Sequence, residues 1–331
     1  MAIFNGVHTT QSEADTLVES YGENGKEKPE EQEVLFHAKF GDGRDEYPVV
    51  AGRYRLIWSK VCPFAQRNKI IFALLGLDDV ISTGTVANEK TKDGWEFTDS
   101  PNQEDPVLKI KRLVDIYDET DPDFQGRALV PTLVDIKTHK VISSDYFQLP
   151  NQWEVDWKKF HRKNAPDLYP EKLRKQIDEL NDIIFTDINT CVYKVGNSST
   201  EEKKEKYRDI FFNRMDELEE RLSKQRYLFG DQITDSDIRL YTTLARFDSV
   251  YYPLFKVNRK KLVDYPNLWN YAKDLYQTEG FASTTFFEDI IQGYIASFPL
   301  NCTEDIQRTV DRNLWSAPHD RAKKFNEIKK E

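Results

Sequence analysis

The sequence lacks any apolar run of about 18 residues, the length that a membrane-spanning helix requires. Its first residues also lack the basic start and the apolar stretch of a secretory signal, and carboxylates follow soon after, at Glu13, Asp15, Glu19 and Glu23. We therefore expect a soluble, cytoplasmic protein that has no membrane partner.

Cysteine is scarce, and the three that are present, Cys62, Cys191 and Cys302, lie more than one hundred residues apart in the sequence. This spacing offers no disulfide framework and no C-x-x-C pair, which suits a reducing compartment. The histidines form no H-E-x-x-H motif, and the glycine-rich nucleotide-binding motifs are absent too. The sequence therefore predicts no structural disulfide, no metal and no nucleotide cofactor.

Positive charge is in deficit, because 47 Lys and Arg stand against 57 Asp and Glu, giving a formal net charge of -10. Such a charge repels phosphate backbones, so we expect no nucleic-acid partner. The length of 331 residues predicts about two domains, and 39% hydrophobic residues are enough to give each a core.

Three stretches differ in their sequence pattern. Residues 1–50 are polar and charge-rich, and predict an N-terminal extension that either stays extended or wraps over the body through Phe36, Phe40 and Tyr47. Residues 51–155 carry strand and helix signals, whereas residues 156–331 have apolar residues at helical spacing. In this last stretch, Thr234 and Asp237 form a capping-box pattern that predicts the start of a helix.

The second stretch begins with a strand, a turn and a helix. The β-type run YRLIW at 54–58 is followed by Cys62 and then by Pro63, which suits the first turn of a helix that Gly76 ends. Two further strands are predicted at 129–135 and 140–143. Pro131 lies inside the first of them, which makes that strand either an edge strand or the site of a special bend.

Cys62 is the main candidate for chemistry. The start of a helix offers unpaired N–H donors and the positive end of the helix dipole, which together lower the pKa of a thiol. Because Ala65 stands where a C-x-x-C motif has its second cysteine, Cys62 would carry a mixed disulfide that an external thiol must release. The alternative is a small buried side chain at a turn, and we expect Cys191 and Cys302 to be structural in this sense.

Val130 and Pro131 add to this pattern. An apolar residue before a proline, some seventy residues after a Cys-Pro helix start, is the arrangement in which a cis peptide bond exposes the preceding backbone to a peptide-like ligand. The alternative is an ordinary edge-strand proline, and the sequence does not distinguish the isomers.

With these residues, the chain resembles the glutathione transferases. The resemblance rests on Cys62-Pro63-Phe64-Ala65, on Val130-Pro131, on the hairpin that leads into Ser144-Asp145 and on the helical second half. More narrowly it resembles the Xi class, the glutathionyl-hydroquinone reductases, in the segments 59–67, 94–95, 126–127, 187–194 and 237–248. The resemblance implies a thioredoxin-like domain over 51–155, an all-α domain over 156–331, and a homodimer.

The resemblance also implies an activity and a set of site residues. Cys62 would take the glutathionyl group from a glutathionyl-hydroquinone, and Tyr193 and Tyr294 would hold the aromatic substrate, with Tyr241 and Tyr251 as alternatives. For the co-substrate glutathione, the resemblance assigns Trp95 to stacking, Arg127 to a carboxylate, the Val130 backbone to main-chain hydrogen bonds, and Ser144 and Asp145 to the γ-glutamyl end.

Several positions depart from the family pattern. Ser144-Asp145 replaces a Glu-Ser pair, Phe64 replaces a tryptophan, Gln66 replaces a histidine, and 301–304 lacks the family's Asn-Pro-Thr-Gly. Two other functions therefore stay open. One is a broader thiol transferase or dehydroascorbate-type reductase that uses glutathione or another small thiol. The other is a non-catalytic binding protein on the same fold.

Overall fold

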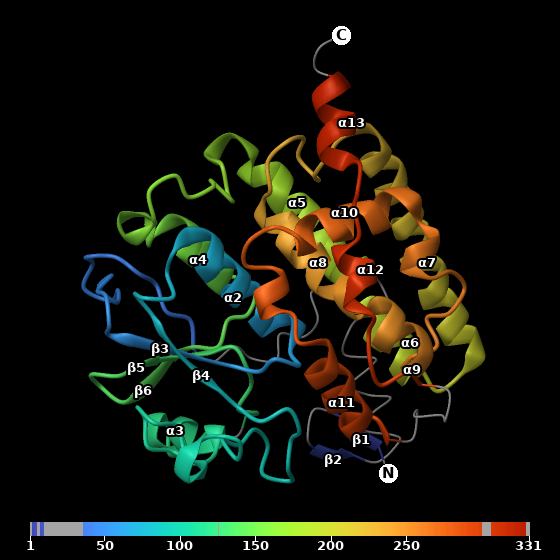
Figure 1. The fold of residues 1–331 in the computed structure, drawn as a ribbon. Coiled ribbons are helices and arrows are strands. Elements are labelled where there is room, and N and C mark those ends of the chain that lie inside the picture. Colours follow the sequence, from blue (N-terminus) through green and yellow to red (C-terminus); the bar gives the residue numbers. More distant parts are fainter. Residues whose placement is uncertain (1, 5–6, 10–35, 125, 300–305, 329–331) are drawn as a thin grey trace. The chain divides into compact units, whose positions relative to one another are not determined.

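The computed structural model describes residues 2–4, 7–9, 36–124, 126–299 and 306–328 (Figure 1). The chain forms two compact units. The first comprises residues 1–165 together with 292–298, and the second comprises 166–291 together with 299–331. Near the N-terminus, β1 (Ala2–Phe4) and β2 (Val7–Thr9) pair in antiparallel orientation.

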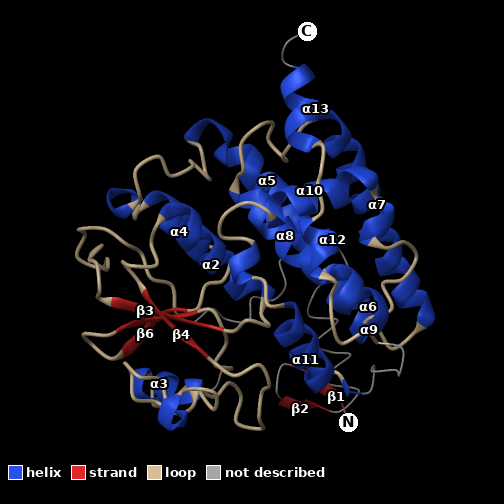
Figure 2. Ribbon diagram, viewed as in Figure 1, coloured by secondary structure: helices blue, strands red, loops and turns tan. Residues whose placement is uncertain are grey.

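A four-stranded mixed sheet lies at the centre of the first unit (Figure 2), and its strand order is β4-β3-β5-β6. Its strands are β3 (Tyr54–Trp58), β4 (Ser82–Thr85), β5 (Thr132–Asp135) and β6 (Lys140–Ser143). β3 pairs in parallel with β4 and antiparallel with β5, and all five of its residues are buried. The predicted strands at 54–58 and 140–143 are thereby confirmed, whereas β4 was not predicted.

Helices cover both faces of this sheet. α2 (Pro63–Leu75) and α4 (Leu149–Val155) lie on one face, and α3 (Leu113–Thr120) lies on the other (Figure 2). α2 has the predicted limits, because Pro63 occupies its first turn and Gly76, at φ +78°, donates its N–H to the carbonyl of Phe72 at 2.8 Å.

The segment before β5 corrects one expectation. The Val130–Pro131 peptide bond is cis, and the strand begins only at Thr132. β5 is hydrogen-bonded to β3 on one side and to β6 on the other, so it is an inner strand. The edge-strand interpretation of Pro131 was therefore wrong: the proline lies outside the ladder, where its missing N–H costs no hydrogen bond.

Residues 36–48 pack on the first unit through aromatic side chains. The ring of Phe40 lies 5.4 Å from that of Tyr54 and 5.3 Å from that of Trp157, in edge-to-face orientation. The hydroxyl of Tyr54 donates to the carbonyl of Pro48 at 2.6 Å. This end of the polar N-terminal stretch thus follows the wrapping alternative.

The second unit is built from helices. They are α5 (Arg174–Ile184), α6 (Cys191–Asn197), α7 (Glu201–Lys224), α8 (Asp235–Arg246), α9 (Tyr252–Leu254), α10 (Pro266–Tyr276), α12 (Arg312–Ser316) and α13 (Arg321–Ile328). α11 (Phe287–Ser297) begins here, and its residues from Gln292 onward belong to the first unit. Short 3₁₀ turns lie in the first unit at Pro101–Gln103 and Lys158–Phe160, and in the second unit at Glu171–Leu173, Leu262–Asp264 and Ala282–Thr284.

Two π-helical turns interrupt this helical pattern. Phe185–Asn189 continues from α5 toward α6, and Phe247–Tyr251 continues from α8 into α9. The start of α8 matches the predicted capping box, because the carboxylate of Asp237 accepts hydrogen bonds from both the N–H and the hydroxyl of Thr234, at 2.8 and 2.9 Å.

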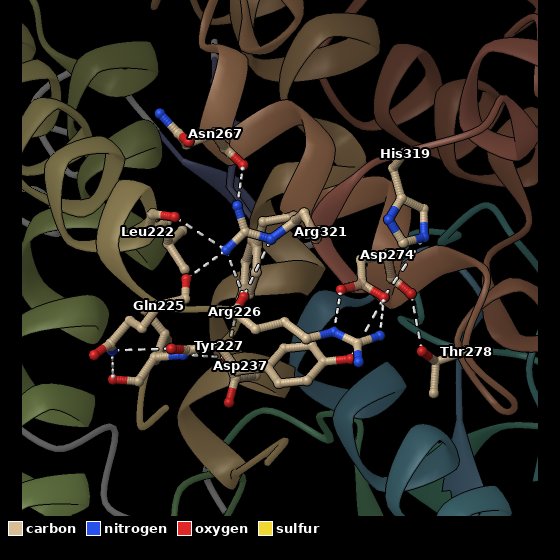
Figure 3. Close-up of polar contacts among 12 residues, drawn as sticks. Leu222, Gln225, Arg226, Tyr227, Asp237, Asn267, Asp274, Thr278, His319 and Arg321 are labelled. Atoms are coloured by element: carbon tan, nitrogen blue, oxygen red, sulfur yellow. Dashed lines mark hydrogen bonds and ion pairs between the residues drawn. The ribbon is translucent and has the colours of Figure 1, made fainter. Parts of the chain in front are cut away.

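The C-terminal helix α13 is fixed to the second unit by a buried guanidinium. Arg321, of which 1% is exposed, donates to the backbone carbonyls of Leu222, Gln225 and Arg226, and to that of Asn267 (Figure 3). Leu222 lies in the last turn of α7, where no intrahelical donor remains for its carbonyl, and Gln225 and Arg226 directly follow the helix.

The mixed sheet with its covering helices and the helical second unit together confirm the predicted fold class, a thioredoxin-like domain followed by an all-helical domain.

Candidate active site

Cys62 occupies the N-cap of α2, the position that the sequence predicts. The residue is half-buried, and its Sγ atom lies 3.4 Å from the carbonyl oxygen of Val130. Its own carbonyl accepts the N–H of Gln66 at 3.1 Å, so the chain enters the helix directly after the thiol. The two predicted site residues Cys62 and Val130 are thus in contact, although they are far apart in the sequence.

A buried phenol supports the turn that carries Val130. The hydroxyl of Tyr117 lies 2.8 Å from the hydroxyl of Thr132 and 3.5 Å from the carbonyl of Leu129. Burial raises the pKa of Tyr117 to about 12, so this side chain remains a neutral hydrogen-bonding group at physiological pH. Tyr117 therefore contacts one residue on each side of the cis peptide bond, Leu129 at its carbonyl and Thr132 at its hydroxyl.

Lys90, which the sequence analysis did not identify, is a neighbour of the predicted site residues. Trp95 is buried, and the Nζ atom of Lys90 lies 4.7 Å from the centre of its ring. Burial lowers the pKa of Lys90 to about 8, while the charge of Cys62 raises it and the charge of Arg127 lowers it. No sequence motif marks Lys90, because its place depends on the turn that precedes Trp95.

Ser144 and Asp145 follow β6 at the start of the turn into α4. One carboxylate oxygen of Asp145 accepts the N–H groups of Phe147 and Gln148, at 3.0 and 2.9 Å, and the other lies 3.0 Å from Nδ1 of His37. The N–H of Ser144 donates to the carbonyl of Phe36. The acid at this position thus stabilises the turn, and its role toward a γ-glutamyl group stays a prediction.

The aromatic residue after Cys62-Pro63 also has defined neighbours. Phe64 lies with its ring 5.0 Å from that of Tyr146, and the guanidinium of the buried Arg67 lies 4.8 Å from the Phe64 ring centre. Phe64 and Tyr146 are both half-buried. An aromatic pair from the starts of α2 and α4 therefore borders the turn that carries Asp145.

Tyr193 lies in α6, in the second unit. Its hydroxyl is 3.2 Å from the hydroxyl of Tyr251, and its ring packs against those of Tyr251 and Phe255. Tyr251 ends one π-helical turn and the other leads toward α6; such turns are frequent at functional sites. Of the two alternatives to the predicted tyrosines, Tyr251 is in contact with Tyr193, whereas Tyr241 pairs with Thr285.

Tyr294 lies in the part of α11 that belongs to the first unit. It is 4% exposed, and its ring stacks on that of Phe298 at 6.2 Å. The preceding residue, Gly293, packs so closely that an added Cβ would lie 2.5 Å from Cγ2 of Val61. Tyr294 therefore directly follows a residue that packs against Val61, the neighbour of Cys62 in the sequence.

The other cysteines differ from Cys62. Cys191 is fully buried and its thiol donates to the carbonyl of Tyr207 at 3.2 Å; burial raises its pKa to about 12, as expected of a structural residue. Cys302 lies outside the described residues. In the described part of the chain, no three His, Cys, Asp or Glu side chains are grouped to bind a metal, and none of its helices has the length and apolar character to span a membrane.

Comparisons with known proteins agree with this geometry. Residues 201–274 match the family model "Glutathione S-transferase, C-terminal domain". The chain is 37% identical to the glutathionyl-hydroquinone reductase YqjG of Escherichia coli K12, over 74% of this chain and 75% of the relative. The glutathione-bound structure of YqjG matches with a TM-score of 0.79, covering 86% of this chain and 92% of that one.

Two further solved structures are similar. A glutathione transferase from Gordonia bronchialis shares 42% identity and a TM-score of 0.83, covering 88% of this chain and 90% of that one. A Xi-class transferase from Natrialba magadii shares 31% identity and a TM-score of 0.80, covering 87% of this chain and 89% of that one. The chain therefore belongs to the glutathionyl-hydroquinone reductase family, the Xi class of the glutathione transferases.

Proposed function

We propose that the protein reduces glutathionyl-hydroquinones to hydroquinones through Cys62, with glutathione as the co-substrate. The observation that carries the proposal is the position of the Cys62 thiol at the start of α2, half-buried and 3.4 Å from the Val130 carbonyl. The family supports it as well, since the relative YqjG carries this activity in its name and was solved with glutathione bound.

The reaction has two thiol-exchange steps. In the first, the Cys62 thiolate attacks the sulfur of the glutathionyl-hydroquinone; an S–S bond forms, the C–S bond to the ring breaks, and the ring carbon takes a proton. In the second, a glutathione thiolate attacks the mixed disulfide and leaves as oxidised glutathione, while Cys62 regains its thiol. For each hydroquinone released, one free glutathione is thus consumed and joined to the glutathionyl group of the substrate as oxidised glutathione, and no second protein cysteine is needed.

The residues that we assign to glutathione have side chains that suit the binding of the tripeptide. Arg127 presents a planar cation for a carboxylate, Trp95 an aromatic face, and Val130 its backbone groups at the cis proline. We assign Ser144 and Asp145 to the γ-glutamyl end, where the Asp145 carboxylate, which already accepts two backbone N–H groups, would pair with the ammonium group.

The aromatic substrate is assigned to two phenols. Tyr193 and Tyr294 would hold the ring oxygens, because a phenol can both donate and accept a hydrogen bond. The contact of Tyr193 with Tyr251 gives its hydroxyl a defined direction. We also propose that the chain acts in the cytoplasm, where its thiols stay reduced, and as a homodimer, which light scattering on the purified protein would test.

The test uses glutathionyl-menadiol as the substrate. A single addition without free glutathione should release menadiol and leave one glutathionyl group on the Cys62 peptide, read by mass spectrometry. Cys62→Ala should lower turnover by about a thousandfold or more, whereas the matched control Cys302→Ala should retain it. A Cys62→Ala variant as fast as the parent would exclude the mechanism. Faster reaction with aliphatic mixed disulfides than with glutathionyl-menadiol would favour the broader thiol transferase.

A further inference from the structure

Lys90 lies in the segment that follows β4 and runs beside the chain leading into Cys62. At the end of β3, the carbonyl of Trp58 accepts the N–H of Val86 at 3.0 Å, which ties the start of this segment to the chain that leads into Cys62. Further along, an added Cβ at Gly293 would lie 2.5 Å from Val61 and 2.7 Å from the carbonyl oxygen of Asn88. Residues 61 and 88 therefore border the same point of the first unit.

A tight turn then fixes the direction of Lys90. Thr91 and Gly94 exchange backbone hydrogen bonds at 2.9 and 3.1 Å, and Gly94 has a φ of +93°, which favours glycine. The residues that flank this turn are Lys90 and Trp95, and the ammonium of Lys90 lies 4.7 Å from the centre of the Trp95 ring. The half-buried ammonium is thus held on one side of the turn, against the face of a buried aromatic ring.

Cys62 and Arg127 both lie close enough to Lys90 to affect its pKa, which Cys62 raises and Arg127 lowers. Lys90 is therefore within electrostatic range of the Cys62 thiol, and its ammonium is only partly solvated. The charged form of a partly desolvated ammonium is stabilised by a nearby anion, and the anion that Cys62 can supply is its thiolate.

From this arrangement we propose that Lys90 is a positioning residue that stabilises the Cys62 thiolate through charge. The helix start and the Val130 carbonyl fix where the sulfur lies, and Lys90 makes the ionised form of that sulfur more favourable. The inference rests on the proposed function only in its link to turnover, because ionisation of the thiol can be measured without any substrate.

The test measures alkylation of Cys62 by iodoacetamide as a function of pH, with the modified peptide quantified by mass spectrometry so that Cys191 and Cys302 are read separately. In the variant Lys90→Met, the pKa of Cys62 should rise by about one unit, so that alkylation at a pH well below that pKa becomes about tenfold slower. Lys90→Arg keeps the charge and should restore most of the parent rate.

Lys92→Met is the matched control, because Lys92 is exposed in the same turn and carries the same charge. It should alkylate like the parent, and circular dichroism should show the same fold in all variants. An unchanged Cys62 titration in Lys90→Met, or an equal change in Lys92→Met, would overturn the proposal.

Turnover of glutathionyl-menadiol separates this inference from the proposed function. A shifted titration in a protein that releases no menadiol supports the role of Lys90 and removes the proposed function. Normal turnover in the parent protein, together with an unshifted Cys62 titration in Lys90→Met, supports the proposed function and overturns the role of Lys90. A shift together with slower turnover in Lys90→Met, both restored in Lys90→Arg, supports both.

Discussion

The Sγ atom of Cys62 lies 3.4 Å from the carbonyl oxygen of Val130, across a separation of 68 residues. The first residue is the N-cap of α2, and the second precedes the cis proline and β5. The contact joins the thiol that we propose as the reactive group to the backbone that we propose for binding the tripeptide.

The charge on Lys90 predicts a dependence of Cys62 reactivity on both pH and reagent charge. Burial lowers the pKa of Lys90 to about 8, so the ammonium is charged at pH 7 and loses its proton as the pH rises through about 8. The Lys90 ammonium should therefore favour anionic reagents at Cys62 more strongly below that pH than above it, whereas Arg127 stays charged over the whole range and adds no pH dependence.

The ratio of the alkylation rates of Cys62 with iodoacetate and with iodoacetamide measures this directly, because the thiolate fraction cancels. We expect the ratio to fall by about threefold between pH 7 and pH 9, and to stay level in Lys90→Met. A ratio that is independent of pH in the parent protein would contradict the prediction.

The hydroxyl pair of Tyr193 and Tyr251 predicts an effect of a residue that the family assignment does not include. Tyr251→Phe removes the group 3.2 Å from the Tyr193 hydroxyl and leaves the ring in place. A phenol with a less defined direction should lower kcat for glutathionyl-menadiol by about tenfold, with little change in the KM for glutathione.

The adjacent Tyr252→Phe provides the control, since Tyr252 is half-buried and its ring packs on that of Phe247. It should keep the parent kcat. Equal losses in the two variants would mean that Tyr251 acts only through packing.

Local signals explain which parts were predictable. The helix that carries Cys62 was predicted from Pro63 and Gly76, since both act on the backbone within one turn. β4 was missed because its four residues, STGT, carry no alternation of apolar side chains, and only pairing with β3 defines it. Periodicity alone did not reveal α3 either.

Long-range contacts explain what was missed in the site. The pairing of Tyr193 with Tyr251 spans 58 residues, so the sequence offered Tyr251 and Tyr241 as equal alternatives. Lys90 reaches its place only through the turn before Trp95 and the electrostatic environment that it shares with Cys62. Neither relationship leaves a pattern in composition or spacing.

The close approach of Gly293 to the Cys62 turn predicts that a single methyl group disturbs the site. In Gly293→Ala, the new Cβ would lie 2.5 Å from Cγ2 of Val61 and 2.7 Å from the carbonyl oxygen of Asn88. Overpacking against a backbone atom costs about 1–3 kcal/mol, and the higher helix propensity of alanine returns about 1 kcal/mol.

We therefore expect Gly293→Ala to lower the free energy of unfolding by about 1 kcal/mol and to slow alkylation of Cys62. Ala296→Ser, at an exposed position of the same helix, should change neither quantity. Alkylation at the parent rate in Gly293→Ala would show that the Cys62 turn does not depend on this contact.

The last prediction concerns Arg321, which joins α13 to the end of α7 (Figure 3). Its guanidinium is buried, and burial lowers its pKa, although arginine keeps its charge at every working pH. Arg321→Met leaves the carbonyls of Leu222 and Gln225 without this donor. Each buried acceptor that is left without a hydrogen bond lowers the free energy of unfolding by about 1–3 kcal/mol.

Urea unfolding should show a loss of about 3 kcal/mol in Arg321→Met. Arg321→Lys should recover only part of that loss, because an ammonium cannot reach four carbonyls from one planar group. Arg308→Met is the control, since Arg308 is exposed and its replacement should change stability by less than about 0.5 kcal/mol. A stability of Arg321→Met equal to that of Arg308→Met would mean that solvent replaces the guanidinium at the end of α7, and that α13 contributes little to the second unit.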